Sequence, residues 1–163
     1  MNLEHIQTVT VPMEALAEVI ELQLQTGGKA NLTVTGNSML PMLHHRKDSG
    51  MLVPVEDKQN IGQVILYRRE NGRYVLHRII AVTPDGYVCC GDNQFEKEPV
   101  AHRQLIASVV SFTRKGKLYD CSSLGYRFYT AIWVRGFFLR KTYIKLRRCL
   151  GRLRQKIAGG NVK

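Results

Sequence analysis

Three short motifs in this sequence hold residue types that could do acyl-transfer chemistry. In the first, Ser38 stands between Gly36 and Pro41. Glycine permits tight backbone geometry, and proline fixes the direction in which the chain leaves a turn. Such a turn can project a hydroxyl and leave backbone N–H groups free for an oxyanion, so Ser38 is the predicted nucleophile. The residues predicted to form the oxyanion and substrate region are Gly36, Asn37, Met39 and Pro41.

The second motif is a histidine inside a strand-like run, residues 73–82. His77 alternates with Val75 and Ile79, so the three share one face of the predicted strand. A histidine there is often a packed core residue. A serine nucleophile, however, needs a base that is neutral near the working pH, and imidazole, with an ordinary pKa of about 6.5, provides one. His77 is therefore the predicted general base.

The third motif, Gly91-Asp92-Asn93, directly follows another strand-like run, residues 86–90. An aspartate near the histidine can accept a hydrogen bond from its second ring nitrogen and fix the tautomer. The same residues also suit an ordinary turn at a strand end. Asp92 is the predicted third catalytic residue, and this chemistry needs no metal and no cofactor.

Together the three motifs resemble the signal peptidase I family and the related self-cleaving repressor peptidases. The resemblance covers about residues 30 to 113, and Asp48 and the segment 61–65 agree with it. Members of the family use lysine or histidine as the base. With His77 in this position, the chain resembles the histidine branch, which is that of the endoplasmic-reticulum type. In that branch an acid about six residues beyond the motif aspartate is an alternative third residue, which is Glu98 here. The choice between Asp92 and Glu98 as the third catalytic residue stays open. Asp92 is favoured because both of its neighbours, Gly91 and Asn93, match the family motif.

The resemblance implies a serine endopeptidase that cleaves a peptide or an exported precursor protein. One alternative is a self-cleaving regulator; His77 in place of lysine, and too short an N-terminal segment for a DNA-binding domain, argue against it. Another alternative is a non-catalytic protein on a peptidase fold that binds a membrane or nucleic acid. The presence of both Ser38 and His77 argues against that second alternative.

The elements that must position these residues are mostly short strands. Alternating apolar residues begin at Ala30, and turn-forming residues separate the later runs. This pattern predicts a mainly β fold, an antiparallel coiled or barrel-like sheet, with an N-terminal helix over residues 11–25 and a basic helical tail. We expect a helical extension at 1–29, a catalytic domain at 30–118 and the tail at 119–163.

Charge is unevenly distributed along the chain. The net charge is +11, yet the last acidic residue is Asp120, so the excess lies in the tail. Aromatic residues and leucines are mixed with basic residues there, which favours a helix lying on an anionic membrane surface. The alternatives are a helix packed on the body and, less favoured, a nucleic-acid contact. The predicted membrane-contact residues are Trp133, Arg135, Phe137, Arg140 and Lys141.

Localisation is predicted from features that the sequence lacks. No basic segment precedes an apolar stretch at the N-terminus, so no signal peptide is predicted. No apolar run reaches the roughly 18 residues that span a bilayer. The four cysteines include an adjacent pair and no C-x-x-C spacing, which indicates reduced thiols rather than disulfides or zinc ligands. We expect a peripheral membrane protein on the cytoplasmic side.

Overall fold

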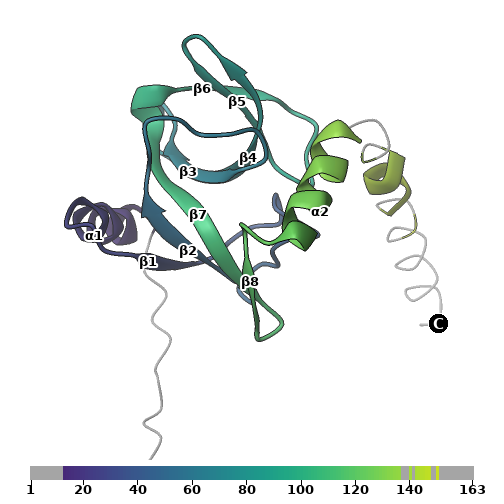
Figure 1. Cartoon of the computed structure of the whole chain (residues 1–163), viewed down its shortest axis with the longest axis horizontal. Helices are drawn as coiled ribbons and strands as arrows, with labels where there is room; N and C mark the ends of the chain where they lie inside the picture. The colour runs from purple at the N-terminus through teal and green to yellow at the C-terminus, as the bar shows by residue number, and fades with distance from the viewer. Residues whose placement is uncertain (1–12, 137–139, 141, 148–149, 151–163) are drawn as a thin grey trace, which may run out of the picture.

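The computed structural model describes residues 13–136, 140, 142–147 and 150, and its fold is mainly β (Figure 1). Seven strands follow one another across a curled antiparallel half-barrel in the order β1-β2-β7-β3-β4-β5-β6, and β8 pairs with β7. The strands are β1 (Ala30–Thr33), β2 (Ser49–Pro54), β3 (Val64–Arg68), β4 (Tyr74–Thr83), β5 (Gly86–Cys90), β6 (Glu98–Ala101), β7 (Leu105–Arg114) and β8 (Lys117–Asp120). The predicted fold class is confirmed.

The curled sheet is covered on both faces, and β3 shows this most directly. Val64 and Leu66 lie in a larger hydrophobic cluster, whereas Ile65 and Tyr67 lie in a smaller cluster. Because successive side chains of a strand point to opposite faces, the two clusters occupy opposite faces of the sheet at this point. Strand β4 pairs with β3 and therefore also presents alternate residues to two different environments.

Two helices flank the sheet at opposite ends of the view in Figure 1, and residues of both pack against the larger cluster. Helix α1 (Met13–Gln25) packs Leu16, Ile20 and Leu24 against the larger cluster, a spacing of one helical face. Helix α2 (Leu124–Arg135) begins at Ser123, whose side chain accepts a hydrogen bond from the backbone N–H of Tyr126. Among the described residues, no helix combines the length and apolarity needed to cross a membrane.

Strands β6 and β8 have no counterpart among the strands predicted from sequence. β6 contains Pro99, which has no N–H to donate and is tolerated because this strand ends the order of the sheet. Every residue of β8 is exposed, so the strand has no alternating apolar pattern. Both strands form because a neighbouring strand offers backbone partners, which local periodicity does not reveal.

Candidate active site

Ser38 lies in the loop between β1 and β2, where it is half-buried in a turn. Packing holds this loop in place, because the side chains of Met39, Met42 and Leu43 are buried in the larger cluster. At the far end of the loop, the carboxylate of Asp48 accepts hydrogen bonds from the backbone N–H of His44 at 2.8 Å and from its ring at 2.7 Å. The loop is thus anchored by packing next to Ser38 and by hydrogen bonds at its far end.

His77 lies in β4, opposite Ile65 of β3, and only 4% of it is exposed. Its neighbours along the same face, Val75 and Ile79, belong to the smaller cluster, as the alternation predicted. Its Nδ1 atom lies 3.1 Å from the hydroxyl oxygen of Tyr67, which is within hydrogen-bond distance.

Gly91 marks the point at which Ser38 and His77 come together. A Cβ atom built there would lie 2.8 Å from the carbonyl oxygen of Ser38 and 3.1 Å from Nε2 of His77. The next residues hold the serine loop in place: the backbone N–H of Asn93 donates to the same Ser38 oxygen at 2.7 Å, and its side-chain amide donates to the Asn37 carbonyl at 3.0 Å. The third motif therefore positions the nucleophile loop against the histidine.

A chain of hydrogen bonds leads away from the other side of the histidine ring. The hydroxyl of Tyr67 donates to Glu98 at 2.8 Å, so its oxygen accepts from His77. Glu98 in turn accepts from Nε and Nη2 of Arg69 at 2.6 and 2.7 Å. This order of donors places the His77 proton on Nδ1 and leaves the lone pair of Nε2 directed toward Gly91 and Ser38.

The surroundings shift the pKa values of this chain of residues in different directions. Burial lowers the pKa of His77 to about 4, although the negative charge of Glu98 acts to raise it. The hydrogen bonds from Arg69 lower the pKa of Glu98 below its usual range. Burial and the bond to Glu98 raise the pKa of Tyr67. At neutral pH the imidazole is therefore uncharged, the tyrosine is protonated and the glutamate is ionised.

The predicted hydrogen bond between Asp92 and the second ring nitrogen of His77 is wrong. Asp92 accepts two hydrogen bonds from Arg78, at 2.8 and 2.7 Å, and both side chains are fully buried. The Nδ1 atom of His77 contacts Tyr67 instead. A fully buried carboxylate pairs with the nearest cation because an isolated charge is costly to bury. The geometry thus favours Glu98, the alternative acid, although it acts through Tyr67.

Arg78 joins segments of the chain that lie far apart in sequence. It follows His77 in β4 and points to the opposite face, where it donates to the carbonyl of Gly62 at 2.7 Å and to the hydroxyl of Tyr126 at 3.0 Å. Its second amino group lies 2.9 Å from the sulfur of Met42 in the nucleophile loop. Arg78 therefore links β4 to the segment before β3, to α2 and to the loop that carries Ser38.

The residues predicted to contact a membrane separate into three groups. Arg135 is exposed, whereas Trp133 stacks on Tyr129 of the same helix. Arg140 is only 3% exposed and donates to the carbonyl of Gln94 and to the sulfur of Cys90, so its predicted membrane contact is wrong. Phe137 and Lys141 lie outside the described residues.

Sequence reasoning missed Tyr67 and Arg69, although a signal for Tyr67 was present. The turn at residues 69–73 closes a hairpin in which Ile65 pairs with His77 and Tyr67 pairs with Val75. In an antiparallel pair, the residue two positions along the neighbouring strand is a diagonal neighbour on the same face. Counting outward from the turn would have placed the tyrosine beside the histidine.

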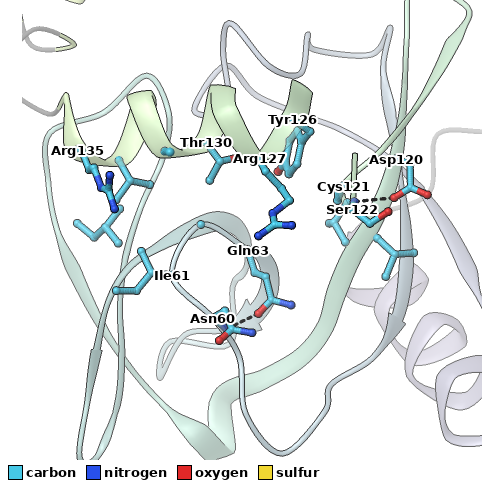
Figure 2. Close-up of a pocket in the computed structure, with 16 residues that line it drawn as sticks. Asn60, Ile61, Gln63, Asp120, Cys121, Ser122, Tyr126, Arg127, Thr130 and Arg135 are labelled. Carbon is cyan, nitrogen blue, oxygen red and sulfur yellow. Dashed lines mark hydrogen bonds between the residues drawn. The ribbon is translucent and has the colours of Figure 1, made fainter. Parts of the chain in front are cut away.

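A groove of about 830 Å³ runs along α2, separate from Ser38 and His77 (Figure 2). Figure 2 shows Tyr126, Arg127 and Thr130 of the helix on one side and Asn60, Ile61 and Gln63 on the other. Neither Ser38 nor His77 lines this groove, so the groove and the candidate catalytic residues are two different places on the molecule.

Comparisons of the chain with protein-family models, with curated proteins and with solved structures found no match. The resemblance to the signal peptidases therefore rests on the sequence motifs alone. Within the described residues, the geometry of the site places the Ser38 loop near a neutral, oriented imidazole, without a hydrogen bond between Oγ of Ser38 and Nε2 of His77.

Proposed function

We propose that this chain is a serine endopeptidase in which Ser38 is the nucleophile and His77 the general base, acting on a peptide or an exported precursor. The observation that supports the proposal most is the meeting of both residues at Gly91, with Nε2 of the histidine toward the serine loop. The alternative role, a packed core histidine, does not require the ring to border a serine turn.

The proposed reaction is acyl transfer by way of an acyl-enzyme. The Oγ atom of Ser38 attacks the carbonyl carbon of the scissile peptide bond while its proton passes to Nε2 of His77. The histidine then gives that proton to the leaving amine as the C–N bond breaks. A water molecule, deprotonated by His77, attacks the acyl-enzyme; the proton returns to Ser38 and the carboxylic acid leaves.

Two features would stabilise the charges that develop. The tyrosine–glutamate chain behind His77 ends in an ionised carboxylate, which favours the imidazolium that forms during proton transfer. Within the described residues, the backbone N–H of Ser38 has no hydrogen-bond acceptor, so it is available to the oxyanion. Gly36 stands where many signal peptidases carry a serine as a second donor, so the backbone supplies more of this stabilisation here.

The experiment that tests the proposal is labelling of the purified protein with a serine-reactive fluorophosphonate, followed by identification of the labelled peptide. We expect labelling at Ser38, its loss in Ser38→Ala, and a fall of about a hundredfold or more in rate in His77→Ala. Ser111→Ala is a matched control, because Ser111 lies in β7, opposite Met51 of β2, and has no role in the proposed reaction.

The pH dependence separates this proposal from simple surface reactivity. Because burial lowers the pKa of His77 to about 4, labelling should be constant at neutral pH and fall only as the pH approaches that value. A free imidazole would lose activity nearer pH 6.5. Equal labelling of the wild type and Ser38→Ala would remove the support for an enzyme.

A further inference from the structure

Helix α2 uses only one of its faces to pack on the sheet. Tyr126 lies against Phe112 of β7, with ring centroids 5.6 Å apart, and Thr130 lies 3.3 Å from a nitrogen of Arg78. Trp133 extends this inner face by stacking on Tyr129. Most aromatic residues of the helix, namely Tyr126, Tyr129 and Trp133, thus lie on its inner face and pack within the protein.

The outer face of α2 is apolar as well. Leu124, Phe128 and Ile132 are spaced four residues apart and are 81%, 71% and 54% exposed. A spacing of four residues places them in one stripe along a helix. A solvated helix normally turns polar residues outward, so a stripe of three large exposed apolar side chains needs a partner.

Basic residues frame this stripe and no acid interrupts it. Arg127 and Arg135 of the same helix are exposed between this stripe and the groove that they also line, and no acidic residue follows Asp120 in the chain. Further along, Leu146 and Leu150 are also exposed, beside the exposed Lys145. Apolar side chains surrounded by cations match the interface of an anionic bilayer, where the former enter the acyl boundary and the latter meet the head groups.

We propose that the outer face of α2 is the docking surface of this protein for an anionic lipid bilayer. The stripe Leu124–Phe128–Ile132 inserts, and Arg127 and Arg135 contact the lipid phosphates. A second copy of the chain fits less well, because two such faces would bring like charges together. Nucleic acid would use the arginines but gain little from the apolar stripe. The proposal does not depend on peptidase activity, and Ser38→Ala should bind lipid as the wild type does.

The test is co-sedimentation of the full chain with vesicles of phosphatidylcholine alone or mixed with phosphatidylserine. We expect binding to the mixed vesicles, weaker binding at high salt, and a fall of about tenfold or more in affinity for Leu124→Gln/Phe128→Gln. The matched control is Val19→Gln/Leu22→Gln, which removes two apolar residues of α1 that are 60% and 65% exposed, at the opposite end of the view in Figure 1. This control should bind like the wild type.

Charge is tested in the same way. Arg127→Gln/Arg135→Gln should weaken binding to the mixed vesicles, whereas Lys29→Gln/Lys58→Gln, an equal loss of charge elsewhere, should weaken it less. The proposal is overturned if no vesicle is bound, or if only the arginine variant loses binding while the apolar variant keeps it, as a polyanion site would. It is also overturned if light scattering shows a dimer that Leu124→Gln/Phe128→Gln dissociates.

Discussion

Strand β4 places two adjacent residues, His77 and Arg78, on opposite faces of the sheet, and each is associated with a carboxylate. On one face His77 reaches Glu98 through the hydroxyl of Tyr67. On the other face Arg78 binds Asp92 directly, with both side chains fully buried. The two acids lie close in sequence and were both candidates for one role, with Asp92 favoured, but the structure gives them different surroundings.

The two carboxylates differ in how deeply the ion pair that each forms with an arginine is buried. The Arg78–Asp92 pair has no contact with solvent, so separating it would leave an uncompensated charge in the core. The Arg69–Glu98 pair is a quarter to a third exposed, so water screens it and it contributes little to folding. Glu98 is therefore free to respond to charge on the histidine, whereas Asp92 is held by the fold.

The largest effect that would test this comparison is on stability. Asp92→Asn should destabilise the protein by about 3–5 kcal/mol, because Arg78 stays buried without its counter-ion. For a chain of this size we expect the melting temperature to fall by roughly 10 °C, measured by circular dichroism. Glu98→Gln, the matched change at the exposed pair, should alter it far less. A variant Asp92→Asn that melts like the wild type but loses labelling would make Asp92 the catalytic acid.

The next largest effect concerns Gly91, where the Ser38 loop approaches the His77 ring. In Gly91→Ala the added methyl group would approach the Ser38 carbonyl and the His77 ring, so one of them must move. We expect fluorophosphonate labelling to fall by roughly a hundredfold, since small displacements of reacting groups are costly. Gly125→Ala is the control, because a Cβ atom there meets no atom within 4 Å. Equal labelling of both variants would show that Gly91 does not set the geometry.

Periodicity and turn residues in the sequence predicted the strands and turns that depend on neighbouring residues in the chain. Alternation in β4 placed His77 with Val75 and Ile79, and the switch to strand periodicity at Ala30 matches the start of β1. Turn residues likewise predicted the strand boundaries around the hairpin of β3 and β4. These features follow from side-chain alternation and backbone restriction, which a single sequence displays.

The remaining features depend on contacts between distant segments. Asp92 pairs with Arg78, fourteen positions away, because the register of β4 with β5 brings them together. Arg140 turns inward because the carbonyl of Gln94 lies within its reach, not because of its own neighbours in sequence. A basic, aromatic segment has the same composition whether it packs on a body or lies on a membrane, so composition alone assigned Arg140 wrongly.

A smaller effect tests the link between histidine and glutamate. Tyr67→Phe removes the acceptor of the Nδ1 proton, so the imidazole is less firmly held in the productive tautomer. We expect the rate of labelling to fall roughly tenfold to a hundredfold at neutral pH. Tyr74→Phe is the control, because it also removes a hydroxyl bonded to a carboxylate, that of Glu21, on the other face of the hairpin. If both variants lose activity equally, the tyrosine serves only the fold.

The smallest effect, and the most specific, is on pH dependence. The negative charge of Glu98 raises the pKa of His77 against the larger effect of burial. In Glu98→Gln that charge is gone, so the pKa of His77 should fall and the acid limb of the labelling profile should move to lower pH. Glu96→Gln removes the same charge from an exposed neighbour and should leave the limb in place. A limb that moves to higher pH in Glu98→Gln, or moves equally in both variants, would mean that the charge of Glu98 does not raise the pKa of His77.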